Sequence, residues 1–462
     1  MRFVFEVMPT GEIGADYPLE HRLAASLAFT GFSLEPVAER MVTLTDTRRR
    51  SKIRPAAEAM SMPVNDYDLI AVGGGLGGAA LAKTMAEAGA RVLVLEQEAK
   101  FKDRVRGEFL APWGVAEARL LFIEDLLQSC GCYVPKVEMG MGAPRDLTAT
   151  TPQGLPALGF SHPQMQEALL EAASKAGAEI RRGTTVTDIQ PGKPPRVQFH
   201  ASSGSEKVSA RLVVAADGRS SAARKWAGFE LKRQSHPFLF AGVLLSGLAM
   251  PQDLGHYCFN PGIAMVNAVV YQGKDRFRAY LGYPSDGIER LQGEQTLPRF
   301  LDESRRTTAS PSFYEGDLRC IGPLASFSCD EDWVEHPYSD GVALIGDAAA
   351  TSDPIFGQGM SLTLRDVRAL SDKLLSSNNW ESASNDYATS HRRYFSVIHT
   401  SCEWLRHVFQ EQSPEADRTR AVAMPLIAED PTRIPDHIMS GPELPIDDGV
   451  RARFFGEQTK AA

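Results

Sequence analysis

The first regular pattern of apolar positions lies in the first quarter of the chain. Residues 69–72 are apolar throughout, and the run stops at the glycine-rich residues 73–78. Apolar side chains then recur at helical spacing, and a second apolar run, residues 92–95, ends at Glu96. Short apolar runs joined through a helix are typical of parallel strands that are buried on both faces. The pattern predicts a strand, a glycine turn, a helix and a second strand, which together form a βαβ unit.

Further elements are predicted downstream. Periodic apolar positions indicate a helix over residues 164–176, with Gly177 as its stop signal. Residues 212–216 and 342–345 are two more buried-strand runs, followed by Asp-Gly and Gly-Asp respectively. Between them, residues 236–319 contain alternating apolar and polar positions, which favour antiparallel strands with one exposed or cavity-facing side. The sequence therefore predicts an α/β fold in which an antiparallel-sheet domain is inserted into a Rossmann-type domain.

The composition is that of a folded globular protein. Of 462 residues, 43% are hydrophobic and 23% charged, and the formal net charge is −9. That mild acidity argues against a nucleic-acid-binding protein, which needs a basic face. The longest strongly apolar run, residues 238–250, is shorter than the roughly 18 residues of a membrane-spanning helix. Neither a signal peptide nor a transit peptide is indicated, because acidic side chains interrupt the N-terminal region. We therefore expect a cytoplasmic protein without a transmembrane segment.

The cysteines give no strong signal for a disulfide or a metal site. The six cysteines form no CxxC pair and have no regular spacing, so reduced thiols are the favoured interpretation. The pair Cys130 and Cys132 leaves metal binding open as an alternative, but partner ligands at metal-site spacing are lacking. We predict no metal site.

The glycine-rich turn carries the first chemical signal. Gly73-x-Gly75-x-x-Gly78 follows a predicted strand and opens a predicted helix, and Glu96 ends the next strand. Gly73 permits the tight turn, Gly75 lets backbone N–H groups approach a pyrophosphate, and Gly78 allows close packing of helix on strand. The Glu96 carboxylate can accept a hydrogen bond from a ribose hydroxyl, and it disfavours a ligand with a 2′-phosphate. The motif predicts binding of FAD or NAD.

Two later motifs narrow this choice. Asp217-Gly218 ends one predicted strand. Gly346-Asp347 ends another, and it is followed by Pro354 and by Gly357-Gln358-Gly359 at the start of a helix. A strand-end Asp can accept hydrogen bonds from ribityl hydroxyls, and a glycine-rich helix start offers N–H donors to an electron-rich ring.

With these three motifs in order, residues 66–373 closely resemble the flavoprotein aromatic hydroxylase family. These are single-component FAD monooxygenases of the para-hydroxybenzoate hydroxylase type, in a superfamily that also holds flavin-dependent halogenases and geranylgeranyl reductases. The resemblance implies an FAD-binding domain in two parts, a substrate-binding sheet domain and a C-terminal helical region. The expected parts are an N-terminal extension that is either a small appendage or partly disordered (1–63), the first FAD-binding part (64–235), the sheet domain (236–319), the second FAD-binding part (320–376), and C-terminal helices around residues 387–410 with a Pro-rich tail (377–462).

The resemblance also implies roles for individual residues. The ADP half of FAD would be held by the glycine motif and Glu96, and by the backbone of Val186 at the adenine. Arg106 would lie near the pyrophosphate and ribitol, with a surface arginine as the alternative. Asp217 would belong to a motif associated with both FAD and pyridine nucleotide, and Asp347 would bind the ribitol. The isoalloxazine would be lined by Pro354, Gly357 and Gly359, although an ordinary turn proline is the alternative at Pro354. The expected cofactor-binding residues are Gly73, Gly75, Gly78, Glu96, Arg106, Val186, Asp217, Asp347, Pro354, Gly357 and Gly359.

Two positions depart from the family pattern, and others stay undecided. Ala350 stands where the family usually has His, and His162 stands where an Arg commonly opens the helix. Both bear on the details of the flavin site. Four polar or aromatic residues of the sheet domain either face a substrate cavity or pack within the sheet, and packing is the favoured interpretation. These are Tyr257, Asn267, Arg278 and Tyr280.

The function implied by the resemblance is hydroxylation of an aromatic or polyketide-like small molecule with O2 and NADH or NADPH through a C4a-hydroperoxyflavin. In this family the cofactor performs the difficult chemistry, and the sequence shows no nucleophile–base pair that would assign a catalytic residue. One alternative is a reductase of a prenyl or alkene substrate. Another is a flavin-dependent halogenase, although the WxWxIP signature of that branch is missing. A non-enzymatic flavin-binding regulatory or assembly protein is the third. The substrate, the nucleotide donor and the oligomeric state are not assigned.

About sixty residues precede the first fold signal. Members of the family begin a few residues before the first strand, and Met60 and Met62 stand where such a start would fall. We therefore expect residues 1–59 to be dispensable for flavin binding, as a misplaced translation start would explain.

Overall fold

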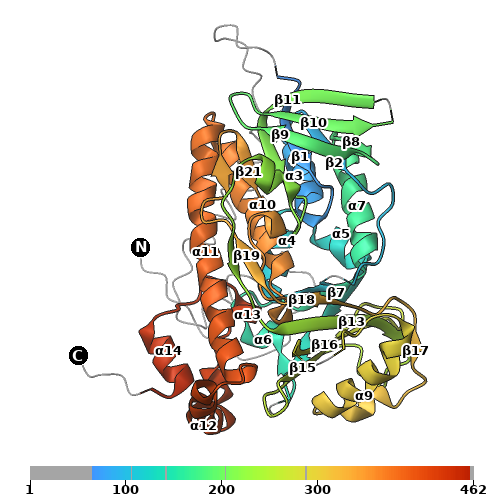
Figure 1. Ribbon diagram of the computed structural model, residues 1–462, viewed down its shortest axis with the longest axis vertical. Helices are drawn as coiled ribbons and strands as arrows, with labels where there is room; N and C mark the ends of the chain where they lie inside the picture. The colour runs from blue at the N-terminus through green and yellow to red at the C-terminus, as the bar shows by residue number, and fades with distance from the viewer. Residues whose placement is uncertain (1–64, 106, 141–142, 203, 287–288, 458–462) are drawn as a thin grey trace, which may run out of the picture. The chain divides into compact units, whose positions relative to one another are not determined.

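The computed structural model describes residues 65–457, apart from residues 106, 141–142, 203 and 287–288. All the described residues belong to one compact unit (Figure 1). The expectations for residues 1–59 and for Arg106 lie outside the described residues.

The predicted βαβ unit is present at the centre of the main sheet. The strand order is β20-β21-β11-β1-β2-β8, and all neighbours are parallel except the edge pair β20–β21. A β9–β10 hairpin extends the sheet by antiparallel pairing with β11. The strands of the main sheet are β1 (Tyr67–Val72), β2 (Val92–Glu96), β8 (Glu179–Arg182), β9 (Thr185–Gln190), β10 (Arg196–Ala201), β11 (Gly204–Ala215), β20 (Tyr338–Ser339) and β21 (Val342–Leu344).

Helices cover the main sheet and bury its apolar strands. Helix α3 (Leu76–Glu87) follows the glycine turn and packs against α7 (His162–Lys175) and α10 (Gly359–Ser376). Helix α7 begins two residues before the predicted start, because Pro163 in its first turn needs no backbone hydrogen-bond partner. The shorter helices in the first half of the chain are α4 (Pro112–Leu120), α5 (Glu124–Ser129), α6 (Leu147–Thr150) and α8 (Ala222–Trp226).

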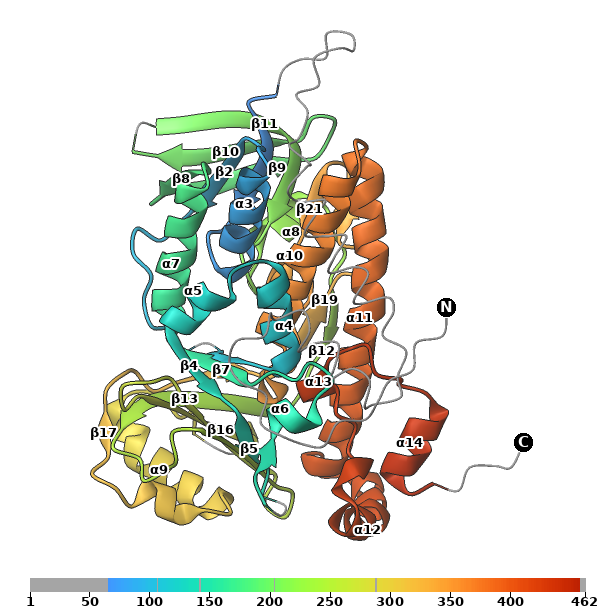
Figure 2. The ribbon, with the colours of Figure 1, turned by 180° about the vertical axis from the view of Figure 1, so that it is seen from behind.

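The second sheet lies at the other end of this unit, below the main sheet in Figure 2. Its order is β17-β13-β16-β15-β14-β5-β6, with β18 also paired to β13, and only β14–β5 is parallel. Three of its strands, β5, β6 and β18, come from outside residues 236–319. The sheet is therefore not formed by that segment alone, and 236–319 stays a predicted domain boundary. Its strands are β5 (Lys136–Glu138), β6 (Arg145–Asp146), β13 (Phe238–Ser246), β14 (Leu254–Asn260), β15 (Met265–Tyr271), β16 (Phe277–Pro284), β17 (Arg319–Cys320) and β18 (Ala325–Ser328).

The alternating pattern in this sheet reflects two different buried faces. Every residue of β15 is buried, although the sequence pattern left an exposed face open. Helix α9 (Leu297–Thr307) covers one face of the sheet, where Phe300 joins its apolar core. Ala268 and Val270 on β15 line a cavity on the molecule's inner side. The cavity-facing interpretation therefore holds for this strand.

Two small sheets complete the strands. One has the order β3-β7-β4 and the other pairs β12 with β19. Their strands are β3 (Phe109–Leu110), β4 (Gly131–Val134), β7 (Ala157–Phe160), β12 (Lys232–Gln234) and β19 (Glu331–Trp333).

The C-terminal region is helical well beyond the predicted stretch. Helix α11 (Trp380–Phe409) runs alongside α10 and continues toward the second sheet (Figures 1 and 2). The residues expected to form a Pro-rich tail instead form α12 (Pro414–Glu429), α13 (His437–Ser440) and α14 (Asp448–Phe455). Proline is compatible with the first turn of a helix, and the Ser413 and Asp447 side chains cap α12 and α14. The structure thus confirms the predicted α/β fold class with a C-terminal helical segment. None of the helices within the described ranges is both long and apolar enough to cross a membrane.

Candidate functional site

A large cavity lies between the glycine turn of the main sheet and the second sheet. Its volume is about 1320 Å³, above the roughly 300–1,000 Å³ usual for small-ligand pockets. All the described residues of the predicted cofactor site line it, except Gly78. These are Gly73, Gly75, Glu96, Val186, Asp217, Asp347, Pro354, Gly357 and Gly359.

The three glycines of the turn are needed for different structural reasons. Gly73 has a φ of +99°, and a Cβ atom there would lie 2.5 Å from the Ala216 carbonyl oxygen. A Cβ on Gly78 would lie 1.9 Å from the carbonyl oxygen of Gly73, so helix and strand could not approach as they do. At Gly75 the nearest atom to such a Cβ is Gln166 Nε2 at 3.5 Å. Gly73 and Gly78 therefore serve the turn itself, whereas Gly75 leaves open space at the start of α3.

The start of α3 is suited to an anion. Gly75 is its N-cap, and no side chain caps the helix by a hydrogen bond. The first N–H groups of the helix are therefore open to a ligand phosphate, which the helix dipole also favours. Glu96 stands beside this turn at the end of β2, where its Oε2 accepts from Gly74 N and its Oε1 from Glu98 N, both at 2.7 Å. These two bonds hold the carboxylate in one orientation at the cavity wall.

Asp217 presents an unsatisfied acceptor near the same cavity. Its Oδ2 accepts from Ala223 N at 3.2 Å, whereas its Oδ1 is buried and has no hydrogen-bond partner among the described residues. A buried acceptor without a partner is costly, so a ligand hydroxyl at this place would be favourable. The adjacent Arg219 also lines the cavity and donates to the carbonyl oxygens of Ser328 and Asp330, at 3.0 and 2.6 Å. The sequence did not single out Arg219.

Asp347 and the start of α10 meet at the cavity. Gly346 has a φ of +59° and donates its N–H to Asp366 Oδ2 at 2.7 Å, which fixes the turn that carries Asp347. A Cβ on Gly359 would lie 3.6 Å from Asp347 Oδ1, so the carboxylate stands against the first residue of α10. Such a carboxylate can accept from ligand hydroxyls, and the helix start can donate N–H groups to a ring.

A short 3-10 turn, Pro354–Phe356, forms the next part of the wall. The Asp353 side chain caps it by accepting from Ile355 N at 3.0 Å, and Gly357 closes it with a φ of +66°. Pro354 therefore opens a turn, which was the alternative interpretation of this proline, and it also lines the cavity.

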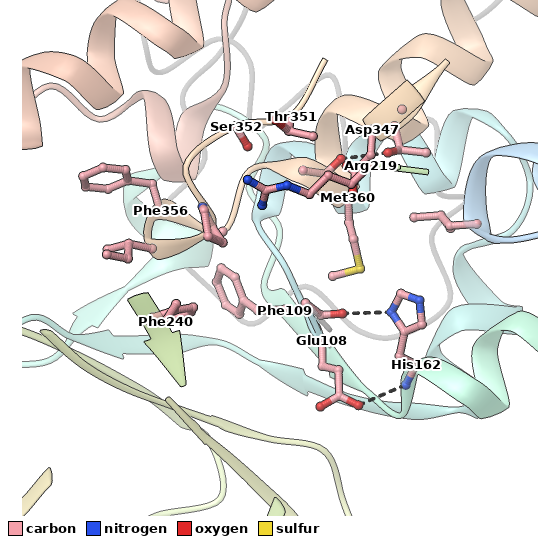
Figure 3. Close-up of a pocket in the computed structure, with 18 of the residues that line it drawn as sticks. Glu108, Phe109, His162, Arg219, Phe240, Asp347, Thr351, Ser352, Phe356 and Met360 are labelled. Atoms are coloured by element: carbon pink, nitrogen blue, oxygen red, sulfur yellow. Dashed lines mark hydrogen bonds between the residues drawn. The ribbon is translucent and has the colours of Figure 1, made fainter. Parts of the chain in front are cut away.

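His162 and Glu108 occupy the opposite wall, as Figure 3 shows. His162 Nδ1 lies 2.9 Å from the Gly107 carbonyl oxygen, and its backbone N–H donates to Glu108 Oε1 at 3.2 Å. Glu108 also accepts from Gln272 and from Arg278, which is fully buried and reaches Asp103 at 2.7 Å. Burial lowers the pKa of Arg278, but Glu108 and Asp103 more than offset this, so its pKa is raised. Arg278 is thus an internal ion-pair residue.

The other three uncertain residues of the second sheet divide between the two roles. Asn267 packs inside, where it donates to the Tyr314 hydroxyl at 2.9 Å. Tyr257 and Tyr280 line the cavity, so sheet packing alone was the wrong interpretation for these two. Burial is the main cause that raises the pKa of both tyrosines well above 10, so both hydroxyls stay neutral near pH 7.

The part of the cavity next to the second sheet is apolar and aromatic. The rings of Phe109, Phe240 and Phe356 gather on one side of it in Figure 3. Several of its residues come from α11 and from the segment before and within α13, which the sequence did not connect with the site. These are Leu405, Phe409, Ile434, Pro435, Ile438 and Met439. Arg145 and Asp436, both in the wall, form a two-point ion pair with N–O distances of 2.5 and 2.8 Å.

The cysteines and acids do not form a metal centre in the described part of the chain. No group of three or more His, Cys, Asp or Glu side chains there could hold an ion. Cys130 and Cys132 are free thiols, and burial raises the pKa of Cys132 to about 11.

Known proteins with similar sequences and folds share this architecture. The family model described as FAD binding domain matches residues 66–394. Aklavinone 12-hydroxylase of Streptomyces peucetius subsp. caesius is 29% identical over 328 residues, which cover 65% of each chain. The 12-dehydrotetracycline 5-monooxygenase/anhydrotetracycline 6-monooxygenase of Streptomyces rimosus is 27% identical over 67% of this chain and 62% of its own length. The chain therefore spans a little under two thirds of these curated relatives.

A solved structure extends the similarity of fold. The p-nitrophenol 4-monooxygenase of Pseudomonas putida superposes with a TM-score of 0.68 at 20% identity, over 80% of this chain and 96% of its own. The matched family model covers the glycine turn, both Asp motifs and the second sheet in one stretch. The protein belongs to the FAD binding domain family, within the superfamily of flavoprotein aromatic hydroxylases, and its cofactor is FAD.

Proposed function

We propose that this protein is an FAD-dependent monooxygenase that hydroxylates an aromatic or polyketide-like small molecule with O2 and NADH or NADPH. The observation that carries the proposal is one continuous cavity, which joins a dinucleotide-type glycine turn to an apolar, aromatic chamber. A cofactor seated along the first part would present its ring to a substrate in the second.

The residues of the first part fit FAD. The open N-terminus of α3 suits a pyrophosphate, and Glu96 suits a ribose. The buried Asp217 Oδ1 lacks a partner that a cofactor hydroxyl would supply, and Asp347 at the start of α10 suits the ribitol. We assign Gly75, Glu96, Val186, Asp217 and Asp347 to FAD, with Gly73 and Gly78 shaping the turn. Pro354, Gly357 and Gly359 would face the ring.

When bound and reduced, FAD supplies the activation of O2 for transfer of one oxygen atom to an electron-rich carbon. The chain's own residues contribute a dry chamber and a fixed geometry. Phe240, Phe356, Phe409 and their apolar neighbours exclude water from the reacting region. The rigid walls hold a planar substrate against the ring end, which reduces the entropic cost of reaction. The neutral hydroxyls of Tyr257 and Tyr280 leave no ionised phenol in the chamber.

The reductant would be NADH or NADPH from solution. The sequence holds a single GxGxxG turn of this kind, at residues 73–78. Transient docking of the nucleotide near the FAD is therefore favoured over a second dinucleotide-binding domain. The free thiols of the described cysteines support a cytoplasmic location.

The apolar chamber would also accept an alkene chain, which keeps the reductase as the second candidate. The two are separated by purifying the protein with FAD and supplying NADH or NADPH with a panel of polycyclic phenols or prenyl alkenes. We expect phenol-dependent oxidation of NAD(P)H and consumption of O2, with one 18O atom from 18O2 in the product by mass spectrometry. Saturation of an alkene without O2 uptake would instead establish the reductase.

A further inference from the structure

Two largely buried polar side chains in the second half of helix α11 are bonded to acidic residues of other parts of the chain. His399 and Arg406 lie there with side chains only 16% and 11% exposed. Both stand beyond residue 394, where the family match ends. They therefore belong to the part of the helix for which the family similarity gives no role.

Glu331 on β19 is the centre of a buried charged cluster around these residues. Its side chain is fully buried and accepts from Arg406 Nη2 at 2.7 Å. His236 Nε2 and His399 Nδ1 lie 3.1 and 3.3 Å from its two carboxylate oxygens. Burial raises the pKa of Glu331, but these partners more than offset burial and the pKa is lowered. Glu331 is therefore a carboxylate.

Asp353 connects this cluster to the cavity wall. Its backbone N–H donates to Glu331 Oε1 at 3.1 Å, and its Oδ2 accepts from Arg406 Nε at 3.3 Å. Its other oxygen, Oδ1, caps the turn that begins at Pro354. Arg406 thus contacts both acids through two different nitrogens, and both acids hold the same turn.

The same stretch of α11 also forms part of the chamber. Leu405 and Phe409, one residue before and three after Arg406, line the cavity and are almost fully buried. Phe409 stacks on Phe259 with ring centroids 4.9 Å apart. One segment of helix therefore contacts both the chamber and the clamp on the turn.

The balance of charge in this cluster makes Arg406 necessary. Two buried acids, Glu331 and Asp353, face one guanidinium and two imidazoles. Burial raises the pKa of Asp353 and the charge of Arg406 acts against this rise, because burying a carboxylate without a partner is strongly unfavourable. Without Arg406, the Asp353 carboxylate would lose its guanidinium partner and move, and the turn that it caps would move with it. Because the turn lines the cavity where the ring would lie, the charge of the cluster would act on the ring across the turn, through a buried region where charges are weakly screened.

We propose that Arg406 is a positioning residue for the flavin: with Glu331 it fixes the turn from Asp353 to Gly357 against the ring and sets the redox potential of the bound FAD. This rests on the assignment of that turn to the ring end of the cofactor under the proposed function. The residue acts through the turn and touches neither the substrate nor the flavin.

The test uses full-length holoprotein with two variants of opposite charge effect, Arg406→Met and Asp353→Asn. Arg368→Met is the matched control, because Arg368 also forms a largely buried ion pair, with Glu117 at 3.2 Å. Arg406 is bonded to Asp353 at the start of the turn, whereas Arg368 pairs with Glu117 and Asp372, away from it. The measurements are the dissociation constant of FAD, by titration of the apoprotein, and the midpoint potential, by equilibration with a redox dye.

We expect Arg406→Met to raise the FAD dissociation constant about tenfold or more and to lower the midpoint potential. Asp353→Asn removes a negative charge and should raise the potential by about 30 mV, which is a tenfold change for a two-electron couple. The double variant should return toward the wild-type potential. Arg406→Lys keeps the positive charge, so its midpoint potential should stay close to that of the wild type. If Arg406→Met does not fold, Arg406→Lys and Asp353→Asn are compared instead.

Potentials that shift in the same direction in both single variants, or by no more than in Arg368→Met, would overturn the proposal. A wild-type protein that binds FAD but does not hydroxylate leaves this test intact, because neither measurement depends on turnover. A wild-type protein that binds no FAD would instead refute the proposed function.

Discussion

Gly75→Val should remove FAD from the protein without unfolding it. Gly75 has φ −70° and ψ −165°, an extended conformation that valine adopts readily. The nearest atom to its added Cβ is Gln166 Nε2 at 3.5 Å, which is an ordinary contact. The valine side chain would stand at the open start of α3, where the pyrophosphate approaches the backbone N–H groups. The substitution therefore fills space meant for a ligand and not space used by the protein.

Gly75→Val should cost little stability but much FAD affinity. Replacing an N-cap glycine by an apolar residue costs about 0.5–1 kcal/mol, which in a chain of this size lowers the Tm by no more than about 3 °C. Hydrogen bonds to a charged group contribute about 1.5–3 kcal/mol each. Losing two of them at the pyrophosphate weakens FAD binding by at least about 100-fold, since 2.7 kcal/mol corresponds to that factor.

The assay is the ratio of flavin absorbance to protein absorbance after purification, together with thermal unfolding of the apoprotein. Gly78→Ala is the control with the opposite outcome. Its Cβ would lie 1.9 Å from the Gly73 carbonyl oxygen, so we expect a large loss of Tm or failure to fold. A folded Gly75→Val protein that keeps one FAD per chain would refute the placement of the pyrophosphate at this turn.

Three further predictions concern the chamber and the charged cluster. Leu405→Ala removes most of a nearly fully buried side chain of the chamber and should cost about 2–5 kcal/mol of unfolding free energy, measured by urea titration. The cavity that it leaves should also enlarge the range of accepted substrates. A smaller cost would mean that neighbouring side chains move in to fill this cavity. Arg145→Met and Asp436→Asn break the same partly exposed ion pair, so each should cost about 1 kcal/mol or less of unfolding free energy. Each should also raise KM several-fold at unchanged FAD affinity. Fully additive effects in the double variant would contradict a direct pairing. Burial lowers the pKa of His399, but the hydrogen bond to Glu331 raises it by more than burial lowers it. The pKa of His399 therefore lies above its usual value of 6.5. The stabilisation it provides is complete below pH 6.5 and is lost as the pH rises through the raised value, so the apoprotein Tm should fall less steeply between pH 6.5 and 9 in His399→Gln than in the wild type.

The sequence predicted those features whose causes lie within a few neighbouring residues. The glycine turn, strand β1 and helix α3 follow from local periodicity and from backbone positions that only glycine can occupy. Their chemistry could be inferred for the same reason, because a strand end and a helix start meet wherever this pattern occurs. The predicted residues that the structure describes, apart from Gly78, line one cavity.

The residues that the sequence missed belong to the site through contacts between distant parts of the chain. Ile438 and Leu405 are ordinary apolar residues whose role depends on where α11 and α13 pack, and no local pattern encodes that. Arg219 stood next to a recognised motif, and its position directly after Asp217-Gly218 was the one available signal. Asp353 preceded the recognised Pro354, but its partner Arg406 lies 53 residues further along the chain.

The interleaved pairing of the second sheet has a consequence for how this protein can be altered. Strand β14 pairs in parallel with β5, which the chain forms more than a hundred residues earlier, and β13 pairs with β18, which it forms much later. An excised fragment 236–319 would therefore have exposed edges on both sides, and a synthesised chain cannot complete this sheet before residue 328. Exchange of this region between relatives as a separate module would have to rebuild both pairings with strands of the receiving chain. New substrate preferences are therefore more accessible through single changes in wall residues than through recombination of segments.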